Sequence, residues 1–408
     1  MSKLIGPFKE IVTLSSAPEK GALDDSALDI VQNAGVLVDD EKILKVGDFD
    51  TLKSETSDVE EIAGDQVLLP GLIDCHTHLV WGGTRARDYT LRMSGESYEK
   101  ILEQGGGIFD SVEKTRAAPS TDLLTGLIRR ANRHLMDGVT TIEVKSGYGL
   151  NVENELKILE VVKDAKADVI SDLIPTCLAA HVCPKEFSDK REFLNYLEND
   201  LLPQLLVKGL TNRIDIFVEP SAFPMEMAKE YLSKAKNLGF ELTIHADQFH
   251  IGGSQIAAEL GARSADHLEA STDREVRILA KSETVAVALP GASIGLGMNF
   301  TPARKLLDAG ASLAISTDWN PGSAPMGDLL VQAAILGIYE KLSSAEIFAG
   351  ITFRAAKALG LNDRGRIANG MKADLAAFPV NDYREILYNQ GKIKPSLVWK
   401  NGKEVNHV

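Results

Sequence analysis

The sequence predicts an α/β fold, a (β/α)8 TIM-like barrel with a small second domain, and three observations support this class. Eight short apolar runs alternate with helical patterns between residues 66 and 361. Near-continuous apolar runs are typical of parallel strands that helices cover. Both chain ends instead carry strand-like runs and tight turns. We therefore expect a barrel domain over 66–361 and a small, β-sandwich-like domain composed of 1–65 plus 362–408.

The eight expected barrel strands are separated by segments with helical spacing. In the segment 121–138, apolar residues from Leu124 to Leu135 recur on one face, and Gly138 follows as a C-terminal cap. A doubly wound open sheet is the alternative, but it would normally carry a G-x-G-x-x-G turn after its first strand, and "GGG" at 105–107 does not fit. The expected strands are 66–78, 140–147, 173–181, 213–220, 241–248, 262–269, 284–291 and 312–319.

The two chain ends are expected to build one small domain. The stretch "AGVLVDDEKILKVGDF" places two strand-like runs around an Asp-Asp-Glu-Lys turn, and "PSLVWKNGKEV" predicts a hairpin. Asn401 and Gly402 suit the two central positions of a type I′ turn, because both residue types tolerate the left-handed conformation.

Composition and charge limit the classes of function. The 408 residues are 44% apolar, and the net charge of −14 disfavours nucleic-acid binding through a basic surface. An anionic substrate must therefore be held by local positive groups. The three cysteines follow no metal or disulfide spacing, and no apolar run approaches the roughly 18 residues of a membrane span. We expect a cytoplasmic protein that binds neither nucleic acid nor membrane.

Polar residues close most of the expected strands, where barrel enzymes place their chemistry. Five of the eight histidines lie at such strand ends, which random placement would not produce. The other three, His134, His250 and His407, are expected to be ordinary structural or surface residues. The strand-end residues are His76, His78, Lys145, His181, Glu219, His245, Asp266, His267 and Asp318.

The pair His76-x-His78 points both imidazoles to one side of a strand, since side chains alternate with period two. An isolated pair of this kind is more often two hydrogen-bonded structural histidines. With His245 and Asp318 from other strands, however, the set offers three nitrogens and one carboxylate oxygen. These ligands suit Zn²⁺ or Fe²⁺ with room left for water, so we expect a metal site.

Several motifs extend the strand-end pattern to whole segments of the chain. "GLIDCHTH", "SADHLE" and "GRIANGMKADLAAF" together resemble the amidohydrolase superfamily. A second set covers nearly the whole chain: "HTHLVWGGTRARDY", "GESYEKILEQGGGI", "GVTTIEVKSGYGL", "AAHVCP", "ADQFHIGG" and "TDWNPGSAP". With these motifs the sequence is similar, within the superfamily, to the imidazolonepropionase family, whose members open an imidazolone ring to N-formimino-glutamate in histidine degradation.

The resemblance implies a role for each matching residue. One divalent ion, zinc or iron, is implied at His76, His78, His245 and Asp318, and His267 and Gln248 resemble a catalytic pair beside it. A homodimer is the oligomeric state that the resemblance favours. The implied contacts of a small anionic substrate, imidazolone propionate, are Arg85, Tyr98, Tyr148, His181, Asn320, Gly322 and Ser323.

Elementary chemistry agrees with these roles. A divalent ion lowers the pKa of bound water toward ~7 and so supplies hydroxide at neutral pH. Asp318 is placed to take the proton of the attacking water and deliver it to the leaving ring nitrogen, and His267 to hydrogen-bond the developing oxyanion. Arg85 offers a planar fork that can grip the propionate carboxylate with two hydrogen bonds.

Three features of the sequence leave alternatives open. Gln248 stands where some relatives carry a glutamate, and an amide does not titrate near neutral pH, which argues against deamination. Lys145 could be carbamylated to bridge two metals, but an ion pair with Glu143 or Glu219 is the simpler expectation. The segment 290–300 has no charged residue and is not aromatic-rich, whereas close relatives are expected to carry aromatic-rich and charged residues there. Hydrolysis of another small cyclic amide is therefore an alternative function, and a non-catalytic metal-binding homologue is a remoter one.

Overall fold

The barrel expected from the eight apolar runs is present. The structure is a computed structural model that describes residues 2–96, 100–101 and 104–405. Eight parallel strands follow one another around the barrel in chain order, and seven of them begin within two residues of the predicted start. The strands are β6 Leu72–Asp74, β7 Val139–Lys145, β8 Asp172–Ala180, β9 Arg213–Ile216, β10 Glu241–Ala246, β11 Ser264–His267, β12 Val285–Ala288 and β13 Leu313–Ile315; the exception is β6, whose predicted run also contains β5.

The barrel closes between its first and last strands. Beyond β6 and β13, Thr77 and Trp319 form an isolated parallel bridge. The backbone N–H of His78 donates to the carbonyl of Trp319 at 2.9 Å, and that of Asp318 donates to the carbonyl of His76 at 3.0 Å. The closure therefore joins the two backbone segments that carry three of the expected metal ligands.

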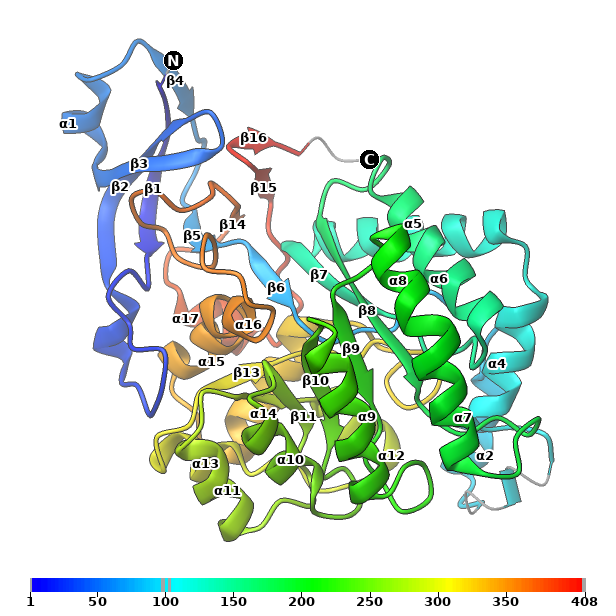
Figure 1. Cartoon of the computed structure of the whole chain (residues 1–408). Coiled ribbons are helices and arrows are strands. Elements are labelled where there is room, and N and C mark those ends of the chain that lie inside the picture. Colours follow the sequence, from blue (N-terminus) through cyan, green and yellow to red (C-terminus); the bar gives the residue numbers. More distant parts are fainter. Residues whose placement is uncertain (1, 97–99, 102–103, 406–408) are drawn as a thin grey trace.

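Helices cover the outside of the barrel, as the alternation predicts (Figure 1). Helix α5 turns Leu123, Leu127 and Leu135 into the core and is followed by Gly138, whose φ of 88° confirms the expected left-handed stop. No helix in the described part of the chain is long and apolar enough to cross a membrane. The helices around the barrel are α2 Ala86–Met93, α4 Ile108–Ala117, α5 Ser120–Met136, α6 Val152–Ala165, α7 Lys190–Tyr196, the π-helix η2 Leu197–Leu201, α8 Leu202–Lys208, α9 Met225–Asn237, α10 Gly253–Leu260, α11 Asp273–Ala280, α12 Pro290–Leu296, α13 Ala303–Asp308, α14 Leu329–Glu340, α15 Ser344–Gly350 and α16 Phe353–Ala358.

Strands from both chain ends form a second, eight-stranded sheet beside the barrel (Figure 1). The N-terminal and C-terminal parts meet where β5 pairs antiparallel with β14. Between β15 and β16, Asn401 and Gly402 have φ values of 52° and 73°, which confirms the expected hairpin turn. The strands are β1 Ser2–Val12, β2 Ile30–Asp39, β3 Lys42–Asp48, β4 Asp58–Glu61, β5 Val67–Pro70, β14 Leu375–Phe378, β15 Leu397–Lys400 and β16 Lys403–Glu404; the accompanying helices are η1 Asp25–Leu28, α1 Phe49–Lys53 and α17 Arg384–Tyr388.

The apolar run 66–78 is divided between the two sheets. The prediction that it forms one barrel strand is therefore wrong. Its first part, β5, pairs with β1 and β14 of the terminal sheet, and only β6 pairs with β7 of the barrel. Gly71 lies between them, where a Cβ would come within 2.4 Å of Thr140 Oγ1. Both parts are equally buried, and only their strand partners differ. The division into domains 1–65 plus 362–408 and 66–361 stays a prediction.

Candidate active site

Histidines and Asp318 gather at the carboxyl end of the barrel strands. His76 and His78 follow β6, His245 belongs to β10, His267 ends β11 and Asp318 follows β13. All five side chains are buried. Residues far apart in the sequence therefore meet where the strand-end pattern places them.

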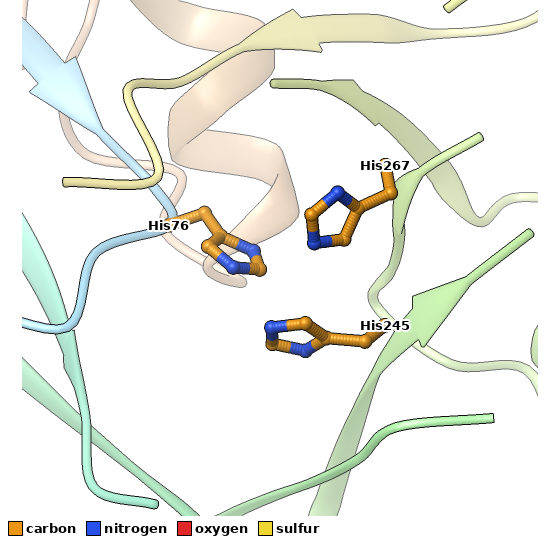
Figure 2. Close-up of side chains that lie close together, drawn as sticks. All are labelled: His76, His245 and His267. Carbon is orange, nitrogen blue, oxygen red and sulfur yellow. The ribbon is translucent and has the colours of Figure 1, made fainter. Parts of the chain in front are cut away.

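The imidazoles of His76, His245 and His267 converge on one centre (Figure 2). The ring centroids of His76 and His245 are 4.5 Å apart, and those of His245 and His267 are 5.1 Å apart. Asp318 Oδ1 lies 3.5 Å from His76 Nε2 and 3.3 Å from His78 Nε2. His76 thus belongs to two groups of potential ligands, one with His245 and His267 and one with His78 and Asp318.

Two buried carboxylates fix the orientation of the central histidines. Asp266 Oδ2 lies 2.6 Å from His76 Nδ1, and Asp215 Oδ2 lies 2.8 Å from His245 Nδ1. A carboxylate at Nδ1 places the ring proton there and leaves the Nε2 lone pair free to bind. His76 Nε2 is buried and has no hydrogen-bond partner among the described residues. A buried acceptor without a donor, beside two further nitrogens and a carboxylate, fits a divalent metal ion.

The electrostatic surroundings keep His76 and His78 neutral. Burial, and then the positive charge of Lys145, lower the pKa of His78 to about 3 and that of His76 well below its ordinary value. Burial raises the pKa of Asp318, although His267 and His245 oppose this shift. Neutral imidazoles have free lone pairs at physiological pH, which metal binding requires.

Asp74 holds the segment that presents Asp318. Its carboxylate accepts hydrogen bonds from Thr317 N at 3.0 Å, from Thr317 Oγ1 at 2.6 Å and from Ser316 Oγ. His134 Nε2 lies 3.1 Å from Asp74 Oδ2 and is wholly buried, in agreement with the expected structural role of this histidine. Asp318 itself has a φ of 51°, so the backbone turns sharply where the carboxylate enters the site.

Arg85 lies against the loop that follows the eighth barrel strand. A Cβ on Gly322 would come within 2.2 Å of Arg85 Nη1, so the absence of a side chain lets the guanidinium approach the backbone. Arg85 Nε donates to Asp88 Oδ2 at 2.9 Å. Asn320 Oδ1 accepts from the N–H groups of Gly322 and Ser323 at 2.7 and 2.8 Å, which shapes the loop. The structure thus brings together four of the residues expected to contact substrate.

Tyr148 and His181 lie beside the histidine cluster. The Tyr148 ring centroid is 5.9 Å from those of His78 and His181. Burial, followed by the charge of Asp318, raises the pKa of Tyr148, and Arg85 opposes this rise. The phenol therefore keeps its proton and can donate a hydrogen bond. Tyr98 lies outside the described residues.

Gln248 is buried in a tightly held loop after β10. Asp247 accepts from Gly252 N at 2.8 Å, and Glu219 accepts from Phe249 N at 2.8 Å and lies 2.7 Å from His250 Nδ1. The His250 side chain is 66% exposed, as expected of a loop histidine that faces solvent.

Lys145 forms an ion pair with Glu143 at 2.8 Å, as expected. The alternative pairing with Glu219 is wrong, because Glu219 turns toward the 249–250 backbone. The further partners of Lys145, Asp215 and Asp266, were not predicted to bind it. The sequence signal for Asp215 was its place in a short apolar run, because an aspartate inside a buried strand needs a charged or hydrogen-bonding partner.

The segment 290–300 is in contact with the substrate-loop candidates. Its helix α12 packs so closely that a Cβ on Gly295 would lie 1.7 Å from the carbonyl oxygen of Ser323. Arg92 donates to the carbonyls of Gly295 at 2.9 Å and Gly322 at 2.7 Å and so joins helix and loop. The segment 290–300 therefore supports the substrate loop on one side of the site, where its composition can affect the shape of that loop.

Comparison with known proteins agrees with this architecture. The model of the amidohydrolase family matches residues 67–405. The chain is 36% identical to the imidazolonepropionase of Bdellovibrio bacteriovorus over 99% of this chain and 97% of the relative, and 39% identical to that of Bacillus cytotoxicus over 95% and 93%.

Solved structures of more distant proteins share the fold. An atrazine chlorohydrolase from Arthrobacter aurescens complexed with zinc has a TM-score of 0.70 at 17% identity, covering 98% of this chain and 94% of its own. An adenosine deaminase from Xanthomonas campestris with bound zinc has a TM-score of 0.71 at 19% identity, covering 98% and 92%. On the family match and the near full-length identity, the chain belongs to the amidohydrolase family and, within it, to the group of the imidazolonepropionases.

Proposed function

We propose that the protein hydrolyses the cyclic amide of 4-imidazolone-5-propanoate to N-formimino-L-glutamate in histidine degradation. One observation carries the choice of substrate: Arg85, a cation suited to a carboxylate, lies against the loop that follows the Asp318 segment. The relatives named imidazolonepropionase support the same reaction.

We assign one divalent ion, zinc or iron, to His76, His78, His245 and Asp318. The neutral state of His78 and the Nδ1 contacts of His76 and His245 support this set, and the zinc-bound structures of the same fold support a divalent ion. Bound there, the ion would supply a nucleophilic water at neutral pH and polarise the ring carbonyl. His₃Asp suits both metals, so the supply in the cell selects between them.

The side chains of the protein carry the protons. Asp318 accepts a proton from the attacking water and returns it to the ring nitrogen as the carbon–nitrogen bond breaks, which leaves a carboxylate and a formimino group. His267, whose ring centroid lies 5.1 Å from that of His245, donates a hydrogen bond to the developing oxyanion. Gln248 has no titratable group, so it orients rather than transfers protons.

The remaining residues bind the substrate. Arg85 holds the propionate, and Tyr148 and His181 contact the ring from the side of β7 and β8. The loop of Asn320, Gly322 and Ser323 closes the opposite side, where Ser323 Oγ lies 3.4 Å from Asp318 Oδ2. Tyr98 is kept in this group on the strength of the family resemblance alone.

The test is hydrolysis of freshly generated imidazolone propionate, followed by the loss of the ring ultraviolet absorbance. We expect turnover by the native protein and none by His78→Ala, with circular dichroism showing that the variant is folded. A native protein that holds metal but does not turn over this compound would contradict the proposed substrate. That result would favour the hydrolysis of another cyclic amide. Helix α12, which packs against the loop with Ser323, would then help to select the substrate.

We also propose that the protein is a cytoplasmic homodimer that binds no nucleic acid. The family resemblance supports the dimer, the three free cysteines support a reducing compartment, and the net charge of −14 disfavours nucleic acid. Light scattering after gel filtration would measure the mass, for which two chains are expected.

A further inference from the structure

Lys145 is a wholly buried lysine at the end of β7, surrounded by carboxylates. Its Nζ lies 2.8 Å from Glu143 Oε1, 2.8 Å from Asp215 Oδ2 and 3.7 Å from Asp266 Oδ2. The three partners come from β7, β9 and β11, so the contacts of the ammonium connect three strands across the interior of the barrel.

Two of these oxygens also contact the central histidines. Asp215 Oδ2 is 2.8 Å from His245 Nδ1, and Asp266 Oδ2 is 2.6 Å from His76 Nδ1. Lys145 is therefore connected to His245 through Asp215 and to His76 through Asp266. A movement of its ammonium would change both Nδ1 contacts together.

We propose that Lys145 is a positioning residue of the metal site. Its ammonium holds the Asp215 and Asp266 carboxylates where they accept the Nδ1 protons of His245 and His76, so that both Nε2 atoms face the ion. This inference rests on the proposed function, since it refers to the metal centre of the hydrolase. It assigns the lysine no contact with substrate.

The charges around Lys145 favour this role over carbamylation. A carbamate would replace the positive charge with a negative one among Glu143, Asp215 and Asp266. Like charges at these distances repel strongly in a buried site, and the carboxylates would lose their compensating cation. The ammonium has the opposite effect, because its positive charge lies within 4 Å of all three carboxylates and compensates their negative charge.

The experiment measures zinc affinity by competition with a chromophoric chelator. Lys145→Met keeps most of the length of the side chain and removes its charge. Loss of the groups that orient metal ligands typically weakens affinity about 10- to 100-fold, and we expect a loss of about this size. We also expect excess zinc to restore kcat in this variant, since the substrate contacts are untouched.

Lys400→Met is the matched control. The Lys400 side chain is 5% exposed and bridges two carboxylates of its own, Asp172 at 2.9 Å and Asp374 at 2.7 Å. Asp172 is the first residue of β8, and Asp374 directly precedes β14 of the terminal sheet, so both lie away from the metal-site histidines. We expect Lys400→Met to lose thermal stability while its zinc affinity stays within about twofold of the native value, because a buried ion pair is broken at a distance from the metal site.

Native zinc affinity in Lys145→Met would overturn the proposal. An equal loss in Lys400→Met would also overturn it, because the effect would then follow from general destabilisation. Zinc affinity is measured without substrate, so failure to hydrolyse imidazolone propionate leaves this result unaffected and the two failures are distinguishable.

A second variant and a measurement on the native protein cover the case in which Lys145→Met does not fold. Lys145→Gln is a smaller uncharged replacement, with the same expected loss of affinity. Native protein incubated with ¹³C-bicarbonate should show no carbamate signal in its ¹³C spectrum. A carbamate on Lys145 would overturn the proposal.

Discussion

Two buried lysines, Lys145 and Lys400, lie at opposite ends of the barrel and bridge carboxylates in similar ways. Lys145 ends β7, at the end of the barrel that holds the histidines. Lys400 ends β15 of the terminal sheet and contacts Asp172, the first residue of β8. Both lysines hold two aspartates, yet their surroundings differ.

The difference lies in what the carboxylates contact next. At Lys400, Asp374 accepts from the backbone of Asn401 at 2.9 Å, and Asp172 pairs with Arg364, so the cluster joins the terminal sheet to the barrel. At Lys145, the aspartates contact His245 and His76 instead. The same kind of buried ion pair is thus structural at one end of the barrel and orients the candidate metal ligands at the other.

The largest expected effects are at the histidine end. We expect Asp318→Asn to lower kcat/KM by about 10³-fold, because it removes the group that transfers the proton. Steady-state hydrolysis of imidazolone propionate measures this loss, and circular dichroism checks the fold. A decrease of less than about tenfold would show that another group moves the proton.

Metal removal should also lower activity and stability through the histidine end of the barrel. We expect a chelator to abolish activity and zinc or iron to restore it. At a metal concentration roughly 100 to 1,000 times Kd, bound metal should stabilise the fold by about 3–4 kcal/mol. Calorimetry of the stripped and reloaded protein measures this difference, and equal melting temperatures would contradict a metal bound by the folded site.

Lys400→Met should separate stability from activity. We expect a loss of about 3 kcal/mol in the free energy of unfolding, the low end for a broken buried pair because Asp172 is partly exposed. Urea unfolding measures the loss, and kcat is expected to stay within about twofold. A large fall in kcat would mean that the two clusters are coupled through the barrel.

Arg85→Lys should change substrate binding more than turnover. Lysine keeps the charge but loses the planar fork, so we expect KM to rise by about tenfold, the equivalent of ~1.4 kcal/mol. The value of kcat should change little. A proportional fall in kcat with unchanged KM would place Arg85 in the chemical step instead of binding.

The smallest effect concerns acid stability at the Lys400 end. Burial tends to raise the pKa of Asp172, but Lys400 and Arg364 lower it to about 2. A carboxylate with a lowered native pKa stabilises the fold above its unfolded value of 3.8, and this contribution is lost as the pH falls from about 4 through 2. Acid titration of native protein and Asp172→Asn should differ in this range, and coincident curves would contradict the assignment.

The barrel could be predicted from sequence because buried parallel strands leave a one-dimensional signal. Each strand is a short apolar run, and each is followed by a segment whose apolar residues recur at helical spacing. The split at Gly71 left no such signal, because β5 and β6 are both buried along their whole length. Which sheet a strand joins depends on its neighbours in space.

The gathering of His76, His78, His245, His267 and Asp318 at one end of the barrel could be predicted, because parallel strands end at the same face of a barrel. The partners of Lys145 were predictable only in part. Glu143 lies two residues away on the same strand, whereas Asp215 and Asp266 reach it across the barrel interior. Such contacts depend on strand order and rotamers, which a single sequence does not specify.

The most direct test of the metal centre is anomalous diffraction from crystals of the metal-loaded protein. We predict one peak at the metal absorption edge, with His76, His78 and His245 nitrogens and an Asp318 oxygen at about 2.0–2.2 Å. A peak held by His267 in place of His78, or a second peak bridged by Lys145, would contradict the account.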